Sequence, residues 1–430
     1  MRRGLRVRRA APTGPAITGS LRALSLLALL FEAAPLAPGE KARAATAPPA
    51  ESVQAVFESG RSARIPIEVG GSGLLFVRAR ISGTPLWFLL DTASPSILGT
   101  RQAIQLGLLP PAALQPKDSS QPAASPAALS NLIVELPGVR VTQPTVSSLD
   151  TAPLQTALGH KVDGVLGTRF FGRFAVSIDS EAGVMELFEP PLPRIEEKGS
   201  ALPLVLDGGL PYLRATLRLP GRPPLSGQFL FDTGADSGVL LYCSFVDKQG
   251  LLGRSPGMDS ETRKTKGESL EAVSRGESLS LARFVLRKPL VTLSRSTQGR
   301  LGDPVHAGLF GSEILRRFRI AFDWARQRII LRPNSHFSEP FDYDASGLTL
   351  QTQGSDLSTL EIRRVLPGSP ASEAGLRVGD VVLAVDGRSV PELTLHGVRR
   401  LLRQDGKEYA LSVYREGQIL KIHLKCRRLL

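Results

Sequence analysis

Two segments of the chain share one pattern, in which a run of large apolar residues ends at an aspartate followed by small residues. They are Trp87–Leu98, WFLLDTASPSIL, and Gln228–Leu241, QFLFDTGADSGVLL. Each run predicts a buried strand that ends in a turn, because Asp and Gly tolerate the backbone angles of turns. An ionised carboxylate is rarely buried without a partner, so Asp91 and Asp232 are either turn residues or paired groups.

The flanks of the two segments match as well, which favours a duplication over two chance turns. Gly164-Val-Leu-Gly167 follows the first aspartate and Gly308-Leu-Phe-Gly311 follows the second. After each of these glycines the pattern predicts a short helical turn and a hairpin of two alternating strands. We therefore expect a mostly β protein with two similar lobes, at 63–190 and 196–335.

The C-terminal part has a different pattern. A polar segment at 332–346 is a plausible linker, and two strands, a short turn, an amphipathic helix near 393–402 and two final strands follow it. Residues 345–430 resemble a PDZ domain of the bacterial, permuted type. The matching features are Pro367-Gly-Ser-Pro-Ala371, Ala374-Gly-Leu376, Gly379-Asp380 and Asp386-Gly387. The resemblance implies an α+β domain in which Gly347, Leu348, Thr349 and Leu350 form the loop that holds a peptide carboxylate.

Composition agrees with a turn-rich β protein of two to four domains. The 430 residues are 42% hydrophobic and 22% charged, with 42 Gly and 33 Pro. The net charge is +13, of which residues 1–44 supply +6. The other basic residues are scattered and aromatic residues are only 6%, so we expect no nucleic-acid partner.

The N-terminus has the pattern of a targeting segment. Five arginines within the first nine residues precede a short apolar core, and Ala42-Arg43-Ala44 offers a cleavage site. We expect a signal peptide at 1–44, a flexible linker at 45–62 and export to the periplasm or the extracellular space. An uncleaved membrane anchor and an organelle transit peptide are the alternatives. No other segment is long and apolar enough to span a membrane, so none is expected in the mature chain.

Cysteine and histidine usage suggests no metal site. The two cysteines, Cys243 and Cys426, fall in different predicted domains, and the five histidines lack metal-ligand spacing. We expect two unpaired thiols, no metal and no cofactor.

Two aspartate-bearing turns from similar lobes can meet at a pseudo-twofold axis. Two carboxyl groups at such a short distance cannot both ionise, so we expect the pair to share one proton, as the two aspartates of aspartic proteases do in general. One group then acts as a base toward water and the other as an acid toward a peptide carbonyl. Residues 63–335 resemble a retropepsin-like aspartic protease with both lobes on one chain, as in pepsin.

The resemblance implies a role for each residue of the motif, and an aspartic endopeptidase as the function. Asp91 and Asp232 would be the catalytic pair, and Thr92 and Thr233 would brace the opposite loops. Ala93 and Gly234 would fill the tight position behind each acid, where Ala departs from the commoner Gly. Gly167 and Gly311 belong to the second family signature.

The fourth positions of the two motifs differ. Ser94 can donate a hydrogen bond to its neighbouring carboxylate, whereas Ala235 cannot. We therefore expect Asp91 to be the ionised partner and Asp232 the protonated one. Polypeptides would be the substrates, and the PDZ domain would bind peptide or protein C-termini.

Three alternatives accompany this interpretation. A trypsin-like serine protease is disfavoured, because His160 is the only histidine upstream of Ser237 and lacks the flanks of a general base. A catalytically inactive peptide-binding scaffold or sensor is the stronger competitor. The segments 114–131 and 252–276 are either substrate-covering flaps or surface loops.

Overall fold

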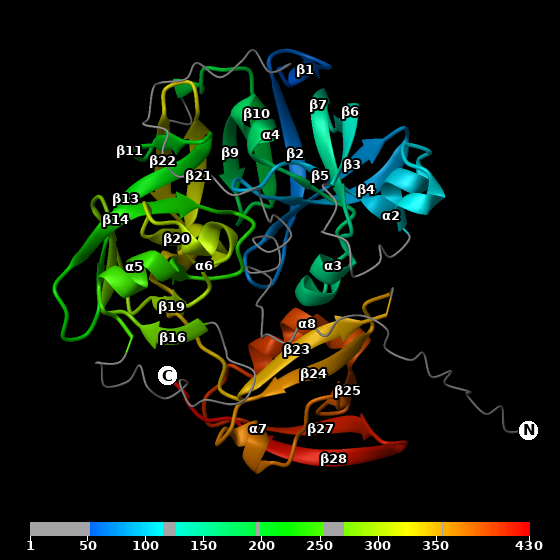
Figure 1. Cartoon of the computed structure of the whole chain (residues 1–430), viewed down its shortest axis with the longest axis vertical. Helices are drawn as coiled ribbons and strands as arrows, with labels where there is room; N and C mark the ends of the chain where they lie inside the picture. The colour runs from blue at the N-terminus through cyan, green and yellow to red at the C-terminus, as the bar shows by residue number, and fades with distance from the viewer. Residues whose placement is uncertain (1–51, 115–125, 195–197, 253–270, 355) are drawn as a thin grey trace, which may run out of the picture.

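The protein is mostly β, with a PDZ domain at its C-terminal end (Figure 1). The structure is a computed structural model and describes residues 52–114, 126–194, 198–252, 271–354 and 356–430. The predicted signal peptide lies outside these residues, as do most of the two possible flaps. Among the described residues, no helix combines the length and apolarity needed to cross a bilayer.

The described residues of the first half form ten strands and four short helices. The strands are β1 (Gln54–Phe57), β2 (Ser62–Val69), β3 (Leu75–Ile81), β4 (Thr84–Leu90), β5 (Ile97–Gly99), β6 (Ala127–Leu136), β7 (Val139–Leu149), β8 (Gly164–Leu166), β9 (Ala175–Asp179) and β10 (Val184–Phe188). The helices are α2 (Thr100–Gln105), η1 (Pro111–Leu114), α3 (Ala152–Leu158) and α4 (Thr168–Gly172).

The second half repeats this order with some changes. Its strands are β11 (Ser200–Pro203), β12 (Val205–Asp207), β13 (Leu210–Arg218), β14 (Leu225–Phe231), β15 (Val239–Leu241), β16 (Glu271–Arg275), β17 (Ser278–Leu281), β18 (Phe284–Arg287), β19 (Leu290–Ser294), β20 (Gly308–Phe310), β21 (Phe318–Asp323) and β22 (Arg328–Pro333). Its helices are α5 (Cys243–Lys248), η3 (Gly299–Gly302) and α6 (Ser312–Leu315), and η4 (Ser335–Ser338) follows.

Equivalent strands of the two halves pair in the same way. β4 runs parallel to β8, with Leu89 opposite Val165, and β14 runs parallel to β20, with Leu230 opposite Leu309. β5 is antiparallel to β8 and parallel to β7, as β15 is antiparallel to β20 and parallel to β19. The apolar runs that precede the aspartates are therefore central strands, which explains why both of their faces are apolar.

One sheet joins the two halves. β9 of the first half pairs with β21 of the second, with Val176 opposite Phe322. The Phe322 ring packs at 5.2 Å from the Phe231 ring and at 6.4 Å from the Phe171 ring, so one aromatic core spans both halves. Burial of these large rings at the junction fixes how the two halves face each other.

Two segments expected to be linkers carry structure. The flexible linker expected at 45–62 contains β1, whose residues pair antiparallel with β7. In QAVF, exposed side chains alternate with partly buried ones, and none is fully buried. Such an alternation is too weak to predict a strand. The connector after β22 contains η4 and is held by the buried Arg317, whose guanidinium donates to the carbonyls of His336 and Glu339 and stacks at 3.7 Å on Phe341.

The PDZ domain is a separate sheet with its own core, as the sequence predicts. Its elements are β23 (Leu348–Gln353), β24 (Thr359–Val365), α7 (Pro370–Glu373), β25 (Val381–Val385), β26 (Arg388–Ser389), α8 (Val390–Leu401), β27 (Glu408–Arg415) and β28 (Gln418–Lys425). β23 pairs only with β24 and is an edge strand of this sheet. Ser389 and Glu392 form a capping box that starts α8.

Candidate functional site

The two aspartate loops meet and brace each other through their threonines. The Thr92 hydroxyl donates to the Phe231 carbonyl at 2.6 Å, and the Thr233 hydroxyl donates to the Leu90 carbonyl at 2.9 Å. Each hydroxyl also accepts from the backbone N–H of the other threonine, at 3.1 and 3.2 Å. These four buried bonds form a symmetric crossing, which holds both loops at a fixed separation.

The crossing places the two carboxyl groups side by side. Gly234 lies so close to Asp91 that a Cβ on Gly234 would stand 2.3 Å from the Asp91 Cγ. Asp91 is 3% exposed and Asp232 is partly exposed. Asp91 accepts a hydrogen bond from the Ala93 N–H at 2.8 Å, and Asp232 accepts one from the Gly234 N–H at 2.9 Å.

The later glycines support the loops from behind. The N–H of Asp91 donates to Leu166 O at 3.0 Å, and the N–H of Asp232 donates to Phe310 O at 3.1 Å. A Cβ on Gly167 would lie 2.2 Å from Ser94 O, and one on Gly311 would lie 2.6 Å from Ala235 O. Both positions therefore require glycine because backbone approaches backbone there.

Burial and mutual repulsion shift the titration of both acids. Burial raises the pKa of Asp91, and the Ala93 N–H, Ser94 and Arg300 offset part of this rise. Burial, followed by repulsion from Asp91, raises the pKa of Asp232 well above its usual range. Because the two carboxyl groups repel each other, ionisation of one disfavours ionisation of the other. The pair can therefore donate and accept a proton at one place.

Three residues near the pair had no signal in the sequence. The Arg300 guanidinium in η3 donates to Ala93 O at 3.3 Å, and its charge lowers the pKa of both acids. Tyr212 and Tyr242 lie near Arg300, and burial raises the pKa of each phenol. A lone arginine in an irregular loop resembles any solvated charge, which is why sequence reasoning missed Arg300.

A cavity of about 640 Å³ lies beside the first aspartate loop. Ala93, Ser94, Arg300 and Trp324 line part of it. Its volume is in the range of pockets that hold small ligands or a few side chains. Neither Asp91 nor Asp232 lines it, so the cavity adjoins the first loop and not the two acids themselves.

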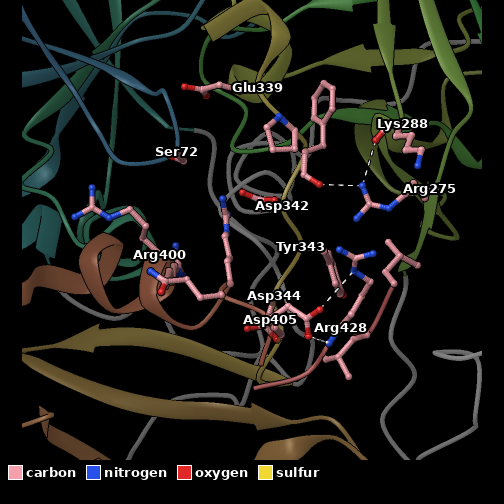
Figure 2. Close-up of a pocket in the computed structure, with 18 of the residues that line it drawn as sticks. Ser72, Arg275, Lys288, Glu339, Asp342, Tyr343, Asp344, Arg400, Asp405 and Arg428 are labelled. Atoms are coloured by element: carbon pink, nitrogen blue, oxygen red, sulfur yellow. Dashed lines mark hydrogen bonds and ion pairs between the residues drawn. The ribbon is translucent and has the colours of Figure 1, made fainter. Parts of the chain in front are cut away.

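A larger cavity of about 1190 Å³ lies where the second half, the connector and the PDZ domain meet (Figure 2). Arg275 on one wall is fixed by hydrogen bonds to Lys288 O and Phe341 O. Arg428 on the PDZ side contacts Asp405. Arg275 and Arg428 are thus held by neighbouring acceptors, and neither Asp91 nor Asp232 lines this cavity.

The predicted carboxylate-binding loop is occupied by its own neighbours. The N–H of Gly347 donates to Asp344 Oδ2 at 2.5 Å, and the N–H of Leu348 donates to Ser346 Oγ at 3.1 Å. Two N–H groups expected to hold a peptide carboxylate therefore already have acceptors. Thr349 and Leu350 continue into the edge strand β23.

The groups weighed for a serine mechanism are held apart in their contacts. His160 stacks on Phe76 at 3.8 Å and contacts Glu68 and the Lys161 carbonyl. Ser237 is buried, and its hydroxyl has no hydrogen-bond partner in the described structure. The two thiols, Cys243 and Cys426, are both buried and unpaired.

Comparison with known proteins identifies one domain of the chain. Residues 361–415 match the PDZ domain family. A curated relative is the "Probable periplasmic serine endoprotease DegP-like" of Chlamydia trachomatis serovar D, 36% identical over 85 residues. These cover 18% of this chain, and the chain spans only 17% of that relative's length.

Solved structures give partial likenesses. The photosystem II D1 C-terminal processing protease is 26% identical over 20% of this chain and 24% of that chain, with a TM-score of 0.19. Basic 7S globulin from soybean is 13% identical over 66% of this chain and 99% of that chain, with a TM-score of 0.38. The HtrA3 PDZ domain bound to a phage-derived ligand is 20% identical over 20% of this chain and 86% of that chain, with a TM-score of 0.18.

The comparison with the curated relative corrects the predicted catalytic class. The sequence predicts an aspartic-type endopeptidase, with an inactive peptide-binding scaffold as its alternative. The predicted aspartic-type endopeptidase is wrong by this comparison, because the relative is a serine endoprotease. The serine class, set aside because of the position of His160, is the class to which the relative points. The prediction of a C-terminal PDZ domain is confirmed.

Proposed function

We propose that the protein is an exported hydrolase of the protease class whose PDZ domain binds the C-termini of its polypeptide substrates. The observation that carries the proposal is the PDZ match at 361–415, in a chain whose curated relative is a periplasmic endoprotease. A PDZ domain binds a peptide by adding it as a strand to a sheet edge, and β23 offers such an edge. The signal peptide expected at 1–44 supports export.

We further propose that Asp91 and Asp232 are the acid–base residues of the site. Their adjacency and raised pKa values support this assignment, because strongly shifted groups cluster at functional sites. Thr92 and Thr233 would keep the pair in register, with Gly167 and Gly311 behind the loops. Ser94 would favour the ionised form of Asp91 and leave the shared proton mainly on Asp232.

The repeated strand pairings support a finer view of the fold. We infer that the two halves are retropepsin-like lobes, related by a pseudo-twofold axis that passes through the threonine crossing. Matched pairings of β4 with β8 and of β14 with β20 support this view.

The function is tested with a quenched fluorescent peptide of twenty residues that lacks stable structure. One version has a free C-terminal carboxylate, and a matched control has an amidated end. We expect the full chain to cleave the free-ended peptide faster, since only that version can use the PDZ groove. No cleavage of either peptide between pH 4 and pH 8 would refute the hydrolase.

Two further arms test the site separately from the function. We expect Asp91→Asn and Asp232→Asn each to lower hydrolysis about 100-fold or more, the usual size of a lost acid–base group. A serine-reactive fluorophosphonate is applied in parallel. Labelling of a serine with loss of activity, and normal rates in both Asn variants, would leave the hydrolase standing and reject the pair.

A further inference from the structure

The peptide groove of the PDZ domain lies between the free edge of β23 and the helix α8. In this protein the helix α3 of the first half lies against both walls (Figure 1). On β23, the Thr352 hydroxyl donates to Thr156 O at 2.8 Å, and Gln351 Nε2 donates to Thr156 Oγ1 at 2.9 Å. A segment about 200 residues earlier in the chain therefore covers the end of the groove at Gln351 and Thr352.

The contacts gather at the C-terminal end of α3. A helix leaves its last carbonyls unpaired, and they carry partial negative charge. Arg399 of α8 donates to Ala157 O at 3.4 Å and to the β23 carbonyl of Leu350 at 2.9 Å. One cation thus joins the helix end to the strand edge, and Leu350 O is one of the acceptors that an added peptide strand would need.

Packing at the end of α3 is close. Gly159 ends the helix with φ 63°, and a Cβ on it would lie 2.8 Å from the Leu395 Cβ of α8. The same Cβ would lie 3.3 Å from the Thr352 methyl. A larger residue at Gly159 would therefore push α3 away from both walls of the groove.

Two N–H groups of the carboxylate loop also have acceptors within the chain. Asp344 and Ser346 accept the N–H groups of Gly347 and Leu348, as described above. The Asp344 carboxylate thus engages one donor that a peptide C-terminus would use, the Gly347 N–H, and the Ser346 hydroxyl engages a second, the Leu348 N–H. Gly347–Leu350 also line a cavity of about 150 Å³, so this end of the groove has open space beside the engaged N–H groups.

We propose that α3 and Asp344 are internal occupants of the PDZ groove, and that a polypeptide C-terminus binds by displacing them. This proposal rests on the proposed function, since it names how the same groove is opened. The competing ligand is a free C-terminal carboxylate with an apolar last side chain, because Leu348 and Leu350 line the strand side. The apparent affinity for the peptide is then the intrinsic affinity multiplied by the fraction of molecules in which the groove is open.

The same contacts reach the loops that carry the two acids. Arg399 also pairs with Asp236 at 3.8 Å, four residues after Asp232. α3 leads through the buried Asp163, which accepts from the Trp87 N–H at 2.9 Å, into β8. Leu166 of β8 accepts the N–H of Asp91. Contacts through Arg399 and Asp163 therefore link α3 to both loops.

The experiment uses the immobilised full chain and a pool of decapeptides with randomised last three residues. The peptides have free carboxylates, and an amidated pool is the control. A peptide recovered from the free pool is then titrated by fluorescence anisotropy. We expect Gly159→Leu and Thr156→Arg to bind it about tenfold or more tightly than the unaltered chain. Ala152→Gln, at an exposed position of α3, should bind like the unaltered chain.

Each outcome decides a different claim. Equal affinity in all four chains would refute the internal occupant and leave tail binding intact. No capture of free-ended peptide by any chain would refute both the inference and the tail-binding part of the proposed function. Should both variants fail to fold, amide hydrogen exchange of 152–159 in the unaltered chain decides. Faster exchange with saturating peptide supports displacement, and unchanged exchange overturns it.

Discussion

The two aspartate loops share a backbone design but differ in side chains. Their threonines exchange equivalent hydrogen bonds across the crossing. The next two residues are Ala93 and Ser94 in one loop, and Gly234 and Ala235 in the other. The crossing is thus symmetric in its backbone, whereas the electrostatic environments of the two acids differ.

The difference has a physical origin in how the loops meet. Gly234 is pressed against Asp91, so no side chain fits there. Ala93 keeps a methyl group, and its carbonyl accepts from Arg300. Ser94 contributes to lowering the pKa of Asp91, although no hydrogen bond of ordinary geometry joins its hydroxyl to the carboxylate. The pKa is accordingly raised at Asp91 and raised further at Asp232.

The largest effect is expected at the tight position. Gly234→Ala places a Cβ 2.3 Å from the Asp91 Cγ, so the loops must separate. We expect a loss of about 1–3 kcal/mol in the free energy of unfolding, the usual cost of overpacking. Urea denaturation measures it, with Ala93→Gly as the matched control. A loss no greater than that of the control, about 0.5–1 kcal/mol for an added glycine, would contradict the crowding.

Replacing either threonine of the crossing should lower the free energy of unfolding by the same amount. Thr92→Val removes the donor to Phe231 O and leaves the buried N–H of Thr233 without its acceptor. Thr233→Val does the same to Leu90 O and Thr92. We expect each to cost about 1–3 kcal/mol by thermal or urea unfolding. Thr216→Val, whose hydroxyl bonds the exposed Ser226, is the control, and unequal losses would break the symmetry.

The raised pKa of Asp232 predicts how stability changes with pH. An acid whose pKa is higher in the folded state costs no stability below its unfolded pKa of about 3.9. The cost grows as pH rises above that value, because the unfolded state ionises first. Asp232→Asn removes this cost, so we expect the variant to gain stability over the native chain above about pH 4.

The test compares the free energies of unfolding of Asp232→Asn and the native chain at about pH 3 and about pH 7. These two pH values lie below and above the pKa of an ordinary aspartate. A gain of about 1.4 kcal/mol corresponds to each unit of raised pKa. The same gain at both pH values would show that burial, and not ionisation, is responsible.

The smallest effect is expected from the fourth position. Ser94→Ala should raise the pKa of Asp91, because the hydroxyl contributes to lowering it. The reciprocal change, Ala235→Ser, should lower the pKa of Asp232. Carbon-13 NMR titration of the aspartate carboxyls follows both shifts. Identical titration curves before and after both changes would remove Ser94 as the source of the asymmetry.

The sequence predicted most of the architecture because the apolar runs and glycines repeat. The strands before each aspartate, the short helices after Gly167 and Gly311, and the PDZ domain all have local patterns. The strand β1 was missed, since only half of its side chains are partly buried. Local patterns also say nothing of which surfaces meet, so the contact of α3 with the PDZ groove was not foreseen.

The site was predicted only in part for a similar reason. The two acids and two threonines stand in a recognisable motif, whereas Arg300, Tyr212 and Tyr242 converge from distant segments. The predicted catalytic class is wrong, because the aspartate motif is local and carries no sign of the serine endoprotease class to which the curated relative points.

The central claim is that Asp91 and Asp232 share one proton at the threonine crossing. Isotope-edited infrared spectroscopy of aspartate-labelled protein measures it directly above pH 5, where ordinary aspartates with a pKa near 3.9 are mostly ionised. We predict one protonated carboxyl band that disappears in Asp232→Asn and persists in Asp236→Asn. A spectrum with every aspartate ionised at that pH would contradict the account.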